Sequence, residues 1–343
     1  MTALTRSLLI LIEYLLDVIL SIYLAKPDVA LRLTHRLMSE VTVHVGGHVT
    51  LLFSVHSEAL LARNQGSRGA GFCLEDGVSA TVKEIPGESD RITVTSMNGT
   101  LLENGETYYS DLLKAFREVF GIKAAVDLEV DLELPVKQGF GMSAAGLMAA
   151  SFALGELFDA GDEGQLARLA HRLERTHSSG LGDVLGIWAG GVELRIEPGT
   201  PPSPGKVLGF EANAPVLLVW NSEGGKHTAG YIDNPVWQAS ITRAGDSAVN
   251  RLMQIPWNTD AWSHLLDEAD NFAENSGLRG EVERSALLDV VKAHTAPEVS
   301  THLCMLGTSA IVVPRELSKP VDLTELAGVL REKGLGTRLT WIH

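Results

Sequence analysis

The 343-residue sequence contains little cysteine and has a clear deficit of basic residues. Its only cysteines, Cys73 and Cys304, lie far apart and form no metal-binding spacing, so we expect no disulfide framework and favour a reducing, cytoplasmic location. Lys and Arg number 28 against 43 Asp and Glu, which leaves a net charge of −15. Nucleic-acid binding requires a basic face that neutralises phosphates, so the composition argues against a nucleic-acid partner.

Of two common nucleotide motifs, one is missing and the other is incomplete. The P-loop motif fails because Gly225-Lys226 is followed by His227, where a serine or threonine is required. A dinucleotide-type G-x-G-x-x-A match does occur at residues 139–144. That fingerprint also needs an acidic residue at the end of a second strand, whereas Glu156 falls on a continuous helix. The dinucleotide interpretation is therefore the weaker one.

The longest apolar run lies at the N-terminus, from Ser7 to Ala25. Glu13 and Asp17 interrupt it four residues apart, on one face of a helix, which favours an amphipathic helix over a membrane span because buried acidic residues are costly there. A strand-like alternation begins only after Met38. We therefore expect residues 1–37 to be an extension outside the functional chain, and we expect no membrane association.

From Glu40 onward, short strands and turns are interspersed with helices. The alternation of Val41 to Val45 predicts a strand that ends at the Gly46-Gly47 pair, and residues 64–77 are expected to form a glycine-dense loop. Helices are predicted over 108–120, 163–176, 262–275 and 281–294, strands over 126–135 and 188–196, and a linker over 198–206. This order predicts an α+β protein with two lobes, at residues 38–200 and 201–343.

The segment from Leu134 to Leu154 is the strongest candidate for phosphate binding. Gly139 and Gly141 permit positive φ angles and a close backbone approach, and a helix begins near Ser143. The first N–H groups of a helix are unpaired and attract anions, while a serine hydroxyl can bind Mg²⁺ or phosphate. Lys137 stands nearby. A glycine-rich turn that simply packs tightly explains the same residues, and the pattern alone leaves both interpretations open.

Two carboxylates follow on the next predicted helix and loop. Glu174 lies late on the helix over 163–176, and Asp183 follows a glycine-bearing turn. Such a pair can divide the work of phosphoryl transfer, one carboxylate holding Mg²⁺ and the other standing near an attacking hydroxyl. A solvated helix end and an aspartate that caps the next helix are the simpler alternative.

Arg68 lies in the stretch GSRGAG, among residues too small to bury it. The planar guanidinium suits a substrate carboxylate, but a surface turn would also place an arginine there. His44 and His48 are four residues apart, and the Gly46-Gly47 pair between them denies them the helical geometry of a metal site. From the residues alone, we interpret both histidines as structural or supporting.

Three segments together resemble the GHMP kinase superfamily. PVKQGFGMSAAG resembles its nucleotide loop, VGGHVTLLFSVH its first motif, and HLCMLGTSAIVV lies where its third motif belongs. More narrowly, GSRGAGFCLEDGV and SSGLGDVLGIWAGGVELRIEPGTPP are similar to archaeal pantoate kinases. The resemblance extends from about Met38 to the C-terminus. It implies a ribosomal protein S5 domain 2-like N-terminal lobe and a ferredoxin-like C-terminal lobe.

The resemblance also implies roles for particular residues. Asp183 would be the catalytic aspartate, and Ser143 and Glu174 would bind Mg²⁺. Nucleotide-binding positions would be Lys137, Gly139, Gly141, Ser143, Ala144, Ala145 and Gly307. Pantoate-binding positions would be Arg68, His48 and Ser67.

The chain departs from the family pattern at several points. Gly46 replaces a proline, Met142 replaces the first serine of the nucleotide loop, and the third motif keeps only Gly307 of a richer glycine loop. The first motif carries no lysine beside the catalytic aspartate, which leaves the proton path open.

The implied function is ATP-dependent phosphorylation of (R)-pantoate in coenzyme A biosynthesis, with ATP and Mg²⁺ and as a possible homodimer. A kinase for mevalonate or a similar hydroxy acid is the alternative within the superfamily. A non-catalytic ligand-binding protein is the alternative outside it.

Overall fold

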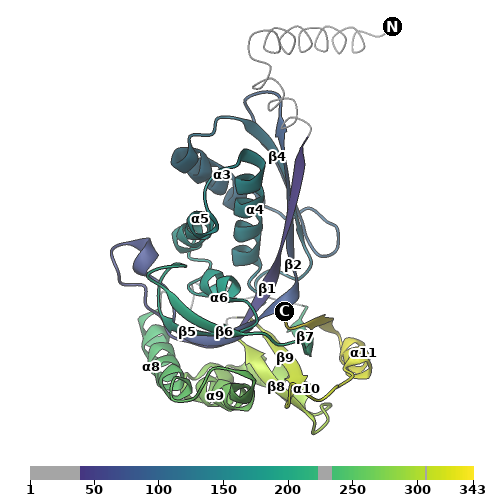
Figure 1. The fold of residues 1–343 in the computed structure, drawn as a ribbon. Coiled ribbons are helices and arrows are strands. Elements are labelled where there is room, and N and C mark those ends of the chain that lie inside the picture. The colour runs from purple at the N-terminus through teal and green to yellow at the C-terminus, as the bar shows by residue number, and fades with distance from the viewer. Residues whose placement is uncertain (1–38, 223–233, 306) are drawn as a thin grey trace, which may run out of the picture.

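The computed structural model describes residues 39–222, 234–305 and 307–343, and these form two lobes, each built around one sheet (Figure 1). The predicted N-terminal extension over 1–37 lies outside the described residues. Within the described ranges, no helix is both long enough and apolar enough to cross a bilayer. The two sheets and their helices confirm the predicted α+β class.

The first sheet has six strands in the order β3-β4-β2-β5-β6, with β1 pairing along the other edge of β2. All neighbours are antiparallel except β3 and β4. The strands are β1 (Glu40–Phe53), β2 (Gly69–Ile85), β3 (Arg91–Thr95), β4 (Ala125–Leu132), β5 (Val192–Glu197) and β6 (Lys206–Phe210). The long β1 and β2 strands carry residues from the outer end of this lobe to its junction with the second (Figure 1).

Two glycine-based predictions were wrong. Gly46-Gly47 does not end the first strand but lies inside β1, where the pairing with β2 shifts register between Gly46 and His48. Likewise, residues 69–77 of the predicted loop belong to β2. The glycines serve close approach instead of a turn, since a Cβ at Gly71 would collide with the carbonyl of Val49 on β1.

Four helices complete the first lobe, and α4 packs directly on β1 and β2. They are α3 (Glu106–Phe120), α4 (Met142–Phe158), α5 (Glu163–Thr176) and α6 (Asp183–Ala189). The predictions over 108–120 and 163–176 are confirmed, with Gly121 ending α3 at a φ of 71° and Asp162 capping α5. The many Ala and Gly residues of α4 let it lie close to the sheet, and it is buried almost all round.

The second sheet has the strand order β10-β7-β9-β8. Its strands are β7 (Pro215–Asn221), β8 (Val299–Cys304), β9 (Ser309–Pro314) and β10 (Leu335–Trp341), and its helices are α8 (Pro235–Leu252), α9 (Trp262–Asn275), α10 (Val282–Lys292) and α11 (Thr324–Glu332). Three short 3-10 turns are η1 (Ala62–Asn64), η2 (Thr259–Ala261) and η3 (Leu278–Gly280). A strand, helices, two strands, a helix and a final strand in this order give the expected ferredoxin-like lobe.

The predicted linker over 198–206 is a connection inside the first sheet. It joins β5 to β6, so the first sheet continues to Phe210, beyond the predicted boundary at residue 200. Proline and glycine are typical both of tight connections and of interdomain linkers, and composition could not separate the two. The lobes pack on each other where α8 and α9 meet β1, with the rings of Phe53 and Phe272 at 5.6 Å.

Candidate active site

The loop between β4 and α4 has an unusual backbone. Lys137, Gly139 and Gly141 have φ angles of 63°, 79° and 70°, and Gly141 is the N-cap of α4. The loop is held from two sides, because His48 N–H on β1 donates to the Phe140 carbonyl at 3.0 Å and the Cys304 thiol on β8 donates to the Gly139 carbonyl at 2.9 Å. The turn is therefore fixed at the N-terminus of α4, where the positive end of the helix dipole attracts anions.

Ser143, in the first turn of α4, donates to Oε1 of Glu174 on α5 at 2.9 Å. Glu174 is 1% exposed, and its second oxygen, Oε2, has no hydrogen-bond partner within the described residues. Burial, together with the negative charge of Asp183, raises the pKa of Glu174 to about 8. A buried carboxylate with an unpaired oxygen suits a cation, whose charge would compensate the cost of burial.

Asp183, the first residue of α6, has a different environment. Its Oδ1 accepts from His48 Nδ1 at 2.8 Å and from the Thr50 hydroxyl at 3.4 Å. Burial alone would raise its pKa, but the hydrogen bonds and the positive charges of His48 and Arg195 hold the pKa of Asp183 below its usual value. The carboxylate is therefore ionised and firmly oriented.

Arg195 on β5 supplies a guanidinium at this end of the site. It is 1% exposed and donates to the Thr50 hydroxyl at 3.2 Å. Glycines make room for it, because a Cβ at Gly69 or at Gly182 would meet its terminal nitrogens. Ser67, 2% exposed, lies next to the same group. The small residues around Arg68 in the sequence thus accommodate a different arginine.

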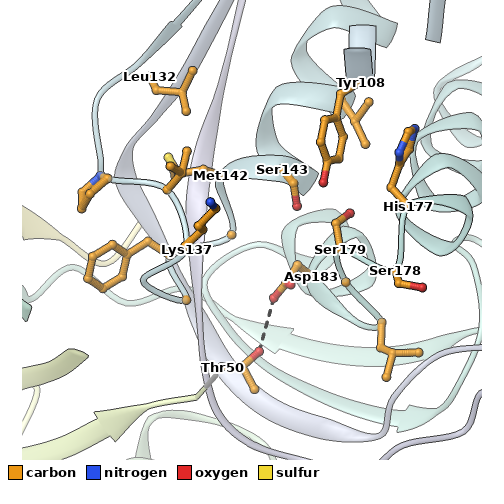
Figure 2. A pocket seen from close by; sticks show the side chains of 18 of the residues that line it. Thr50, Tyr108, Leu132, Lys137, Met142, Ser143, His177, Ser178, Ser179 and Asp183 are labelled. Atoms are coloured by element: carbon orange, nitrogen blue, oxygen red, sulfur yellow. Dashed lines mark hydrogen bonds between the residues drawn. The ribbon is translucent and has the colours of Figure 1, made fainter. Parts of the chain in front are cut away.

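One cavity of about 480 Å³ is lined by the α4 loop, Ser143, Asp183 and Arg195, and its volume lies within the roughly 300–1,000 Å³ of small-molecule sites. Figure 2 shows Ser143, Lys137 and Asp183 around the same space, with Thr50 bonded to Asp183. Tyr108 and His177 line another part of the wall, with their rings stacked at 4.5 Å. We name the two ends by the roles proposed for them below: the α4 loop forms the phosphate end, Asp183 and Arg195 form the acceptor end, and Tyr108 and His177 form an aromatic flank.

The structure brings most of the predicted residues to this cavity. Its walls include Lys137, Gly139, Gly141, Ser143, Ser67 and Asp183. Glu174 stands behind Ser143 and His48 behind Asp183, both buried. Ala144 and Ala145 are buried off the wall, and the Ala145 N–H is bonded to the Gly141 carbonyl. Gly307 supports the loop from outside, packed against Gln138.

Arg68 does not lie on the cavity wall. Its guanidinium points to the second lobe, donating to Asp246 at 3.0 Å and to Asn250 at 2.8 Å on α8, while its Nε donates to the Ile196 carbonyl at 3.0 Å. Adjacent residues of an extended chain point in opposite directions, so Ser67 faces the cavity and Arg68 faces α8. The structure therefore does not place Arg68 where it could contact a substrate carboxylate in this cavity.

Sequence reasoning missed Thr50, Glu193 and Arg195. The last two alternate with apolar residues in a strand that is buried on both faces, and both are at most 1% exposed. Two opposite charges at positions i and i+2 of an otherwise apolar strand were the available clue, since buried charges are rare unless paired.

The fold and the cavity define a small-molecule kinase of the GHMP type, and residues 107–191 match the family described as the GHMP kinases N terminal domain. A pantoate kinase of Thermococcus kodakarensis is 32% identical over 69% of this chain and 76% of its own length. A pantoate kinase of Methanospirillum hungatei is 27% identical over 84% of this chain and 94% of its own. The chain belongs to the pantoate kinase family of GHMP kinases, which confirms the resemblance found in the sequence.

A solved structure supports the same assignment. A protein described as a phosphotransferase related to the CoA biosynthesis pathway superposes with a TM-score of 0.70 at 26% identity, over 89% of this chain and 96% of its own. The match covers both lobes, so the ferredoxin-like lobe is common to the two proteins.

Proposed function

We propose that this protein transfers the γ-phosphoryl group of ATP to the primary 4-hydroxyl of (R)-pantoate, giving 4-phosphopantoate for coenzyme A synthesis. The proposal rests on the family membership and on one observation above all. Ser143, the α4 loop and Asp183 line the same cavity, and Glu174, on another helix, is hydrogen-bonded to Ser143 directly behind the cavity wall. Phosphoryl transfer needs this combination of positioning and charge, and no covalent nucleophile.

The triphosphate would lie at the α4 loop. Gly141, Met142 and Ser143 at the N-terminus of α4 line the cavity there, where helix N–H groups are unpaired, and Lys137 on the same wall adds a positive charge. Although the chain carries a net charge of −15, the N–H groups and the positive charge that bind phosphate are needed only at this one place. The adenosine would lie along the wall that carries Tyr108, since apolar and aromatic side chains suit a base.

Ser143 and Glu174 would hold Mg²⁺ together with the phosphates. The free Oε2 of Glu174 and its raised pKa, about 8, fit a cation, and kinase Mg²⁺ sites use one or two carboxylates plus substrate phosphates. No cluster of three or more His, Cys, Asp or Glu side chains suited to a metal occurs in the described part of the chain. When bound, the ion would neutralise charge on the β- and γ-phosphates.

Asp183 would orient the acceptor and take its proton. The hydroxyl oxygen bonds to the γ-phosphorus, the bond from that phosphorus to the bridging oxygen breaks, and the hydroxyl proton passes to the Asp183 carboxylate as ADP leaves. The lowered pKa of Asp183, maintained by His48 and Arg195, keeps this carboxylate ionised, as a group that orients the hydroxyl and accepts its proton must be. Its hydrogen bonds to His48 and Thr50 fix the direction of approach.

Arg195, in place of Arg68, would bind the pantoate carboxylate. It lines the cavity beside Ser67, close to Asp183, and its planar fork matches a carboxylate. A lysine could not take its place there, because a guanidinium offers a carboxylate two parallel N–H donors and an ammonium group does not.

A substrate panel tests the function. Purified protein with ATP and Mg²⁺ is offered (R)-pantoate, (S)-pantoate, mevalonate and homoserine, and ADP release is coupled to a spectroscopic readout. We expect turnover with (R)-pantoate and a phosphorylated product by mass spectrometry. Turnover with mevalonate and none with pantoate would refute the proposal, as would a lack of turnover with every acceptor.

We further propose that the protein is cytoplasmic and that it forms a homodimer. The two cysteines, Cys73 and Cys304, are free buried thiols, which is in keeping with a reducing compartment that also supplies ATP. Light scattering coupled to gel filtration measures the oligomeric state directly.

A further inference from the structure

A buried carboxylate behind the cavity connects the two groups on which the acceptor end depends. Glu193 on β5 is 0% exposed and does not line the cavity. Its Oε1 is 3.1 Å from His48 Nε2, and its Oε2 is 3.4 Å from Arg195 Nε. His48 in turn contacts Asp183, and Arg195 lies on the cavity wall. Glu193 therefore reaches both functional groups from one side.

The imidazole of His48 is held between two carboxylates. Nδ1 faces Asp183 Oδ1 at 2.8 Å and Nε2 faces Glu193 Oε1 at 3.1 Å. A neutral imidazole has a single N–H and would turn a lone pair toward one of these oxygens, whereas an imidazolium donates to both. The geometry is thus that of a protonated histidine, which cannot take the substrate's proton and serves to orient Asp183.

Charge balance explains why Glu193 is retained in this buried position. His48 and Arg195 are two cations in a closed environment, and Asp183 and Glu193 are the two anions that compensate them. Burying an unpaired charge is expensive, while a network in which each charge has a partner is tolerated and rigid. Without the Glu193 charge, the two cations would share Asp183 alone.

We propose that Glu193 is a positioning residue for phosphoryl transfer, which fixes Asp183 through His48 and fixes the carboxylate-binding guanidinium of Arg195 directly. The inference rests on the proposed function and extends it, because Glu193 touches neither the acceptor nor the nucleotide. It also explains the missing lysine of the first motif, since a histidine on β1, charged by Glu193, stands beside the aspartate instead.

The test is Glu193→Gln, which keeps the size of the side chain and removes its charge. We expect kcat to fall about 10-fold and the KM for pantoate to rise about 10-fold, because both contacts weaken, while the KM for ATP stays within about 2-fold. Asp127→Asn is the matched control. Asp127 on β4 is also a buried carboxylate, 2% exposed, and it pairs with Lys83 and Arg91 away from the cavity.

The control separates positioning from general stability. Asp127→Asn should lower the melting temperature and leave kcat and both KM values at those of the wild type. Glu193→Gln with wild-type kinetic constants would overturn the inference, and so would a control variant with the same kinetic defect at an equal loss of melting temperature.

Two further measurements keep the outcome interpretable. If Glu193→Gln does not fold, Glu193→Asp takes its place in the test, because it keeps the charge and withdraws the carboxylate by one methylene. We expect a smaller loss in kcat and in pantoate affinity for this variant. Wild-type kinetic constants would refute the positioning role. The wild-type protein is assayed first with pantoate. Absence of turnover by the wild-type protein refutes the proposed function, whereas turnover by the wild type with unchanged kinetic constants in the Glu193 variants refutes only the role of Glu193.

Discussion

The two ends of the cavity are built in different ways. The phosphate end is one contiguous stretch, Lys137 to Ser143, whose properties come from backbone angles and a helix N-terminus. The acceptor end gathers side chains from β1, from Ser67 two residues before β2, from α6 and from β5. The first end depends on local conformation and the second on charges that compensate one another only in the folded protein. We therefore expect mutations at the two ends to separate nucleotide from acceptor effects.

The largest effect is expected at Asp183. Asp183→Ala removes the group that orients the hydroxyl and accepts its proton, so kcat should fall by about 10²–10⁴-fold. The KM for ATP should remain within about 2-fold, since no phosphate-end contact is lost. Steady-state kinetics with circular dichroism as the folding control measures this. A folded variant that retains wild-type turnover would remove Asp183 from its role and break the distinction between the two ends.

Arg195 and Arg68 sharpen the comparison within the acceptor end. Arg195→Ala should raise the KM for pantoate about 10- to 100-fold, because a charge-assisted contact worth roughly 1.5–3 kcal/mol disappears. Arg68→Ala should change that KM by less than about 3-fold, since its partners are Asp246 and Asn250 on α8. Parallel pantoate titrations of the two variants give the answer. The reverse ranking would restore Arg68 as the carboxylate-binding residue.

At the phosphate end, the requirement for Mg²⁺ should depend on the Ser143–Glu174 pair. Glu174→Gln keeps the hydrogen bond from Ser143 possible but removes the negative charge, so the Mg²⁺ concentration for half-maximal rate should rise about 10-fold. The KM for pantoate should stay near the wild-type value. Titration of the rate with Mg²⁺ at saturating pantoate measures this, and an unchanged Mg²⁺ requirement would contradict the assignment of Glu174.

The smallest effect concerns stability and pH in the absence of Mg²⁺. The pKa of Glu174 is raised from 4.5 to about 8, so between these values the folded protein holds a proton that the unfolded chain has lost. Its contribution to stability is therefore present at low pH and is lost as the pH rises toward 8. Glu174→Gln should melt about 2–5 °C above the wild type at pH 8.5 and close to it at pH 4.5. A lower melting temperature at pH 8.5 would contradict the raised pKa.

Sequence patterns predicted the helices well and the first sheet only in part. The apolar periodicity of residues 163–176 and the glycine at 121 define helix ends through local hydrogen bonding, and both match the structure. Gly46, Gly47 and the stretch 64–77 were interpreted as a break and a loop. Glycine is also required where neighbouring backbones approach closely, and the identity of those neighbours is not written in the adjacent residues.

The same division holds for the site. Ser143, Glu174 and Asp183 could be identified because each occupies a distinctive position in a motif or at a helix end. Thr50 and Arg195 could not, since their importance comes from each other and from Asp183, across three elements. Ser67 was placed correctly at the cavity, while its neighbour Arg68 was assigned to the same side although the extended chain turns it away.

The sequence by itself determined the glycine turn before α4, the helix that follows it and the family, because these depend on glycine conformations and periodicities within short stretches. Only the tertiary structure decided which arginine faces the cavity and which histidine nitrogen meets which carboxylate. A side chain in a strand alternates between two faces by its position alone, but the partners that make a buried charge tolerable come from other strands. Their placement is a property of the packed sheet.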